Sequence, residues 1–160
     1  LVIYTKYMTL DPSGTSLLDG PVLWRFQKQG WIPRTVEGEW TAEIIPELEP
    51  HPGDVVLRHS SENAFLNTSL KNILQNRKSY DKIEGTKPVT RILVTGMNLG
   101  NGLDPAIMTN YGATQNGVGS FPVIDCLCRE QRQHQNFWVD HNWIPYTSGE
   151  IIAAWKKITP

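Results

Sequence analysis

The chain has 160 residues, of which 39% are hydrophobic and 19% charged, and its formal net charge at neutral pH is −1. This length and composition predict one globular domain with a proper core and exclude a disordered chain. The absence of a basic block argues against nucleic acid or an anionic membrane as partner, and no apolar run approaches the ~20 residues that span a bilayer.

Cysteine use and the start of the chain bear on the compartment. Cys126 and Cys128 are too few and too close for a disulfide framework or a metal knuckle, which makes a reducing compartment the default. Leu1 already has the character of a residue in the middle of a strand, and no signal-peptide pattern follows it. We therefore expect a cytoplasmic protein in which a further segment precedes Leu1.

Alternating strands and helices are predicted from the start of the chain. Residues 1–4 are expected to form a strand, residues 20–29 a short helix and residues 41–48 a helical turn. The irregular loop at 30–40 contains two tryptophans, and these aromatic side chains are expected to hold it down.

The stretch from Pro52 to Leu74 is the most informative part of the chain. A turn leads into the apolar run 55–57, which predicts a buried parallel strand, and six polar residues at 58–63 follow where that strand would end. Apolar residues then recur at helical spacing, and Thr68 or Ser69 is placed to cap the helix. These apolar residues are Leu70, Ile73 and Leu74. Because ligands usually sit at the carboxyl ends of strands in α/β sheets, residues 58–63 are interpreted either as a ligand site or as a solvated loop.

The second half of the chain continues the alternation. Residues 90–94 and 121–124 are predicted to form further buried strands, the second of which ends at Asp125. The remaining helices are expected at 105–114, at 129–142 and from a cap at Ser148 onward. This order predicts a three-layer α/β/α sandwich with a mostly parallel, doubly wound central sheet.

Common catalytic and cofactor motifs are missing from the sequence. It has no P-loop, nucleophile elbow, zinc-protease helix motif or dinucleotide fingerprint, so no cofactor is expected. His134 and His141 have no third ligand between them, so no metal site is expected. The glycine-rich segment 96–102 is either a flexible loop or a backbone surface that approaches a small ligand. Cys126 and Cys128 are expected to be small buried hydrophobes; thiol chemistry is the alternative and requires a lowered pKa.

Short motifs occur in a defined order along nearly the whole chain. They are VIYTK at 2–6, GEWTAEI with PEL and GD at 38–54, AFLNTSL at 64–70, VTG at 94–96, IDC at 124–126 and YTSGEII at 146–152. In order and spacing they resemble the isochorismatase-like hydrolases of the cysteine hydrolase superfamily. The resemblance implies the same sandwich fold, hydrolysis of a small molecule, and a homo-oligomer such as a dimer or tetramer.

The resemblance also implies where the catalytic residues should lie. Most members use an aspartate, a lysine and a cysteine against amides, whereas true isochorismatases hydrolyse a vinyl ether and have glycine in place of the cysteine. Counting along the motifs puts Gly102 at the cysteine position and His59 at the lysine position. The aspartate would lie upstream of Leu1. Vinyl-ether hydrolysis of a small anionic metabolite is therefore expected in preference to amide hydrolysis.

The expected site combines His59 and Gly102 with residues that bind the substrate. Arg58 and His59 would bind or polarise it, and the backbone from 97 to 102 would form the floor of the pocket. The substrate-binding residues are Arg58, Trp40, Phe65, Asn98 and Leu99. The alternative is a catalytically inactive family member that acts as a binding or interaction protein, because none of the three catalytic residues is matched in this chain.

Overall fold

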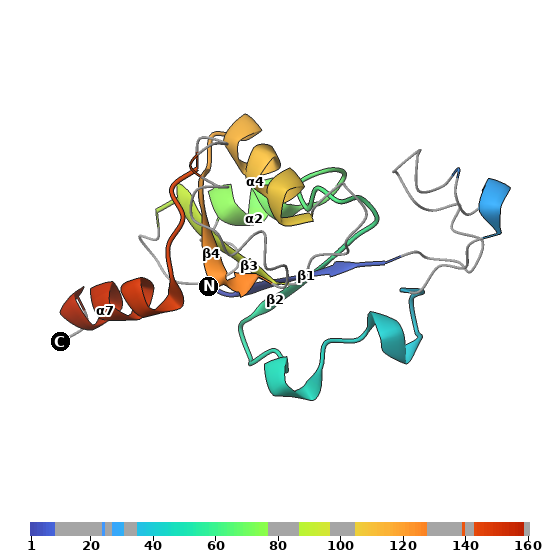
Figure 1. Cartoon of the computed structure of the whole chain (residues 1–160), viewed down its shortest axis with the longest axis horizontal. Coiled ribbons are helices and arrows are strands. Elements are labelled where there is room, and N and C mark those ends of the chain that lie inside the picture. The colour runs from blue at the N-terminus through green and yellow to red at the C-terminus, as the bar shows by residue number, and fades with distance from the viewer. Residues whose placement is uncertain are drawn as a thin grey trace. The chain divides into compact units, whose positions relative to one another are not determined.

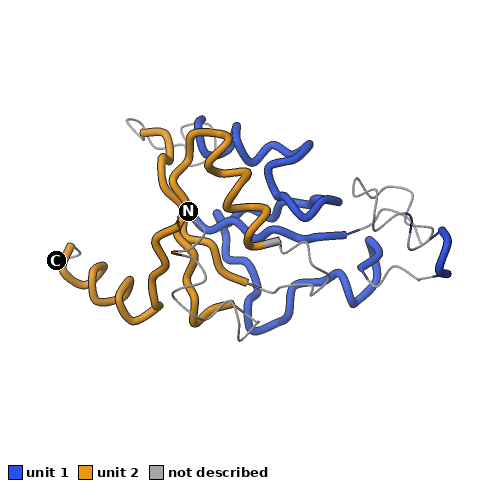
Figure 2. Tube along the Cα trace, turned by 45° about the horizontal axis from the view of Figure 1, so that its top comes forward, with its two compact units in different colours: residues 1–86 blue, residues 87–160 orange. Residues whose placement is uncertain are grey.

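The computed structural model describes residues 1–8, 24, 27–30, 35–76, 87–96, 105–127, 139 and 143–158. The chain forms two compact units, Leu1–Thr86 and Lys87–Pro160 (Figure 2). Each unit contains a pair of parallel strands.

The first unit is built on strands β1 (Ile3–Tyr7) and β2 (Val55–His59), which pair in parallel with Ile3 opposite Val55 and Tyr7 opposite His59 (Figure 1). Parallel neighbours need a long connection, and here it includes the 3-10 helices η1 (Trp40–Ala42) and η2 (Pro46–Leu48). Both predicted strands are confirmed, and the predicted helical turn at 41–48 consists of these two short helices.

Strand β2 is buried on one face only. Leu57 and His59 are buried, whereas Val56 is 44% exposed and Arg58 is exposed as well. The prediction of a wholly buried strand is therefore wrong for β2, and exposed Leu93 shows the same departure in the strand predicted at 90–94. An apolar run identifies a strand, but it does not show how many faces of that strand are covered.

Helix α2 (Leu70–Gln75) follows the polar loop, as predicted, and its buried residues are the three apolar ones at helical spacing. Ser69 occupies the N-cap position without a side-chain hydrogen bond to the helix. Thr68 supplies the hydrogen bond instead, because its Oγ1 accepts from the Leu70 N–H at 3.2 Å and donates to the Ala64 carbonyl at 2.6 Å. The start of α2 is thus tied to the preceding loop.

The second unit pairs strands β3 (Arg91–Gly96) and β4 (Gly119–Leu127) in parallel, with a register shift between Val94 and Gly96 (Figure 1). Helix α4 (Pro105–Gln115) contacts both strands. A buried cluster forms the core of the unit: Val94, Ala106, Ile124, Leu127 and Trp143. The predictions of strands near 90–94 and 121–124 and of a helix at 105–114 are confirmed.

Two details of the second unit differ from the prediction. Asp125 does not end its strand, because β4 continues to Leu127. Helix α7 (Ser148–Ile158) is capped by Thr147 rather than by Ser148. Thr147 Oγ1 accepts from the Glu150 N–H at 3.3 Å, and Glu150 Oε2 accepts from the Thr147 N–H at 2.7 Å. This reciprocal pair is a capping box, which satisfies two backbone donors at the start of the helix.

The predicted helices at 20–29 and 129–142 fall mostly outside the described residues. Gln27, Lys28, Gln29 and, in the second segment, Val139 are helical. None of the helices that the structure describes is long and apolar enough to cross a membrane.

Candidate functional site

The carboxyl ends of β1 and β2 lie side by side, since both strands run in the same direction. Lys6 is opposite Arg58 and Tyr7 is opposite His59 in the register of the pair. Successive side chains of a strand point to opposite faces. One face at this end of the strands therefore carries two cations, and the other carries the Tyr7 and His59 rings.

His59 is held in one orientation by its neighbours. Its side chain is 7% exposed, and Nδ1 lies 2.6 Å from the carbonyl oxygen of Ser61. A carbonyl can only accept a hydrogen bond, so Nδ1 carries the hydrogen and Nε2 keeps its lone pair when the ring is neutral. The Tyr7 ring packs edge-on at a centroid distance of 5.7 Å and an angle of 73°. The imidazole thus presents one defined basic atom.

The surroundings of His59 favour the neutral ring. Burial lowers the pKa of His59, and this effect exceeds the opposite one of its hydrogen bond to the Ser61 carbonyl. At neutral pH the side chain therefore offers a lone pair, and not the permanent positive charge of a lysine. This distinction decides which chemical step His59 can assist.

The loop after β2 is largely buried. Ser61, Glu62, Ala64 and Phe65 are all buried. Asn63 Oδ1 accepts from the Phe65 N–H at 2.9 Å, so the loop is also fixed by its own side chains. The alternative interpretation of 58–63 as a solvated loop is therefore wrong for Ser61 and Glu62.

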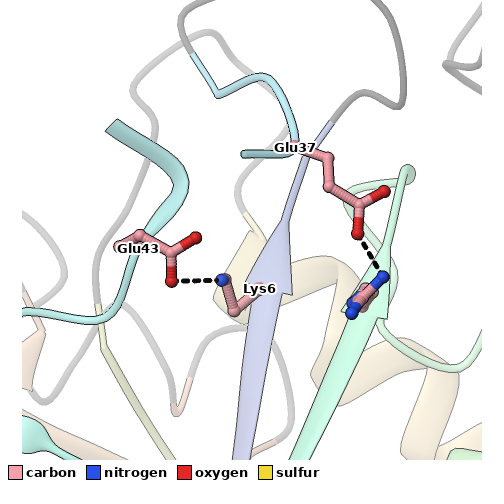
Figure 3. Close-up of polar contacts among 4 residues, drawn as sticks. Lys6, Glu37 and Glu43 are labelled. Carbon is pink, nitrogen blue, oxygen red and sulfur yellow. Dashed lines mark hydrogen bonds and ion pairs between the residues drawn. The ribbon is translucent and has the colours of Figure 1, made fainter. Parts of the chain in front are cut away.

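Each cation on this face of the strands forms an ion pair with a glutamate (Figure 3). Lys6 Nζ lies 3.0 Å from Glu43 Oε2, and Arg58 Nη1 forms an ion pair with Glu37 Oε1. The Lys6 side chain is 13% exposed and that of Arg58 is 64% exposed. Sequence reasoning did not place Lys6, Glu37 or Glu43 at the site, because the pairing of Lys6 with Arg58 follows from strand register and not from sequence distance.

A second polar cluster joins β4 to α7. Ser148 donates its N–H to Asp125 Oδ1 at 2.8 Å and its hydroxyl to Asp125 Oδ2 at 2.6 Å. These bonds lower the pKa of Asp125. The neighbouring thiol of Cys126 is exposed, and desolvation together with the negative charge of Asp125 raises its pKa. The prediction that Cys126 is a buried hydrophobe is wrong, and its raised pKa also contradicts the alternative of a reactive thiolate. Cys128 lies outside the described residues.

Comparison with known proteins identifies the family. The family model of the isochorismatase domain matches residues 2–140. The chain belongs to the isochorismatase family. Its fold is also that of solved family members, and the prediction of an isochorismatase-like α/β fold with parallel strands is confirmed.

Three solved structures illustrate the likeness. N-carbamoylsarcosine amidase from Thermoplasma acidophilum matches with a TM-score of 0.66 and 17% identity over 92% of this chain and 72% of its own. An isochorismatase family protein from Desulfovibrio vulgaris matches with a TM-score of 0.70 and 17% identity over 98% and 75%. Nicotinamidase from Bacillus subtilis matches with a TM-score of 0.64 and 12% identity over 91% and 74%. At these identities the likeness concerns the fold.

The other expected site residues of this isochorismatase-family chain lie as follows. Trp40 is in η1 and is 83% exposed, whereas Phe65 is buried in the loop after β2. Arg58 and His59 point to opposite faces of β2, so a single ligand can reach both only around the carboxyl end of the strand. The remaining three, Gly102, Asn98 and Leu99, lie outside the described residues. A pocket shared by His59 and Gly102 therefore stays a prediction.

The described part of the chain contains no cluster of metal-ligating side chains. Among the residues that the structure describes, no group of three or more histidine, cysteine, aspartate or glutamate side chains could hold a metal ion.

The bonds between Asp125 and Ser148 predict an acid-dependent contribution to stability. Because the pKa of Asp125 is lower in the folded state than in the unfolded state, its ionised form adds stability at neutral pH. That contribution is lost as the pH falls through the folded pKa. We expect Asp125→Asn to lower the melting temperature slightly at pH 7 and to match the wild type in strong acid. Thermal unfolding across this range checks the prediction. Ser148→Ala should remove only part of the same difference, because it deletes the hydroxyl bond and keeps the backbone N–H bond to Asp125.

Proposed function

We propose that this chain hydrolyses a small anionic metabolite by direct attack of water, with His59 as general base. The observation that carries the proposal is the imidazole itself. It is at the carboxyl end of a parallel strand, its Nδ1–H is fixed by the Ser61 carbonyl, and burial lowers its pKa. A neutral imidazole with a fixed tautomer is the usual form of a general base at neutral pH.

The proposed step moves one proton. As the oxygen of water forms its bond to the substrate carbon, Nε2 of His59 takes a proton from that water and the ring becomes an imidazolium. The Ser61 carbonyl accepts the Nδ1–H throughout and so stabilises the charged ring. For an enol ether, the acid that the family resemblance places upstream of Leu1 would first protonate the carbon, which gives the oxocarbenium ion that water attacks. The hemiketal then breaks into a carbonyl compound and an alcohol: the alcohol oxygen takes the proton held by His59, and the hydroxyl proton returns to the acid. Glycine at the position that the family resemblance assigns to the nucleophilic cysteine supports attack by water rather than by a thiol.

The preference for an anionic substrate rests on Lys6 and Arg58. These cations are neighbours in register at the carboxyl ends of β1 and β2. Each is paired with a glutamate carboxylate, but the Arg58 pair is exposed, and exposed ion pairs contribute only about 0–1 kcal/mol. A substrate carboxylate can therefore replace Glu37 at Arg58, and the long Arg58 side chain can reach around the end of its strand.

A second candidate function is binding of a small anion without turnover. It is favoured by the 7% exposure of His59 and by its place on the same buried face of β2 as Leu57. A histidine in such a position can serve the packing of the protein alone. Under this function the family fold is retained as a binding protein.

The pH dependence of hydrolysis separates the two functions. Isochorismate serves as the enol-ether probe and nicotinamide as the amide probe, each assayed from pH 5 to pH 8. Because the base works in its neutral form and its pKa is lowered, isochorismate turnover should stay level down to about pH 6.5, the ordinary histidine value, and fall only below it. Turnover of nicotinamide alone would contradict attack by water on an enol ether. No turnover of either probe would favour the binding protein.

A further inference from the structure

The segment 37–43 is held at both ends by an ion pair to a strand. Glu37 pairs with Arg58 on β2, and Glu43 pairs with Lys6 on β1 (Figure 3). Between them Ala42 is buried while Trp40 is 83% exposed. The segment 37–43 therefore lies against the cationic face of both strands through its glutamates, with its large aromatic side chain turned to solvent.

The two ion pairs differ in their access to a ligand. Lys6 is 13% exposed and is covered in its pair with Glu43, whereas Arg58 is 64% exposed. A ligand from solution meets the Arg58 guanidinium first. A guanidinium also binds a carboxylate through two parallel hydrogen bonds, which an ammonium group does not do. Exchange of one carboxylate for another is thus expected at Arg58 and not at Lys6.

We propose that Glu37 is an internal competitor for anionic ligands at Arg58, and that it sets the affinity of the site for carboxylates. The identity of the competing ligand as a substrate rests on the function proposed above. Glu37 occupies the guanidinium with the same chemical group that the ligand brings. An anion that binds competes with Glu37 for the positive charge and the N–H donors of the guanidinium, so the Glu37 side chain weakens binding without touching the reacting atoms.

The test measures carboxylate binding without turnover. Sodium benzoate is titrated into the full chain at constant ionic strength, and the NMR signal of the Arg58 Nε–H is followed. Glu37→Gln should lower the dissociation constant about fivefold, the most that one exposed ion pair is expected to contribute. Glu43→Gln is the matched control, since it removes the same charge from the neighbouring pair, and it should change the constant less than twofold.

Two results would overturn the proposal. Equal tightening by Glu37→Gln and Glu43→Gln would show a general effect of net charge, and an Arg58 signal that never responds to benzoate would show that the guanidinium binds no carboxylate. Both results are independent of hydrolysis, so a failure of the proposed function leaves this test intact. If turnover is found, Glu37→Gln should also lower KM for the anionic substrate while kcat stays unchanged.

Discussion

Replacement of His59 by glutamine is expected to lower kcat for the preferred substrate about 10²- to 10⁴-fold, the usual contribution of a general base. Glutamine retains a donor that can reach the Ser61 carbonyl, but its amide has no basic lone pair to take a proton from water. Steady-state hydrolysis at pH 7.5 measures the change. The fall in rate below about pH 6.5 should disappear in the residual activity of the variant, since the titrating group is gone.

His51→Gln is the matched control for this substitution. His51 is an exposed histidine of the same unit, in the turn before β2, so the exchange is chemically identical but should leave kcat unchanged. A melting temperature measured for both variants separates loss of catalysis from loss of structure. Unchanged kcat in folded His59→Gln protein would remove His59 from the mechanism and assign it a packing role.

Strands and helices with a strong apolar pattern were predictable from the sequence. The residues of α2 recur at i, i+3 and i+4, and all three are buried. The apolar runs in β2 and β3 were also sufficient to find those strands. Periodicity reflects which side chains must leave water, so it identifies elements well. It does not show which strand pairs with which, and the family fold was reached through resemblance of ordered motifs.

The candidate site was only partly predictable. His59 and Arg58 could be placed at a strand end because turn and strand signals flank them. Their separation onto opposite faces follows from the extension of β2 through His59, two residues beyond the predicted end. The contact of Lys6 with Glu43 joins residues 37 positions apart in the sequence, and no local pattern encodes it.

The N-terminal cap of α7 has a sequence signal of its own. Thr147 and Glu150 have the spacing of a capping box, and that spacing is visible in the sequence. Serine is also a common N-cap residue, so the sequence equally indicates Ser148. In the structure, the hydroxyl and the N–H of Ser148 instead donate hydrogen bonds to Asp125 on β4. A side chain that bonds a distant strand cannot be distinguished from a local cap before the strand is placed.

Replacement of Leu74 by alanine is expected to have the largest effect on stability. Leu74 is 2% exposed and belongs to the buried face of α2. Removal of its buried methyl groups loses transfer free energy and leaves a cavity, which together destabilise proteins by about 2–5 kcal/mol. For a chain of this length, each kcal/mol corresponds to about 2–4 °C in melting temperature. Thermal unfolding should therefore show a fall of at least several degrees.

Leu48→Ala provides the comparison, because it makes the same chemical change at a residue of η2 that is 55% exposed. Its effect should stay within about 0.5 kcal/mol, as for most surface substitutions.

The difference between the two variants also bears on His59. Helix α2 begins where the buried loop after β2 ends, and Thr68 ties the two together through its bonds to Ala64 and Leu70. If Leu74→Ala and Leu48→Ala have the same melting temperature, α2 is not packed as described. Rigid, buried surroundings would then no longer account for a neutral His59 ring.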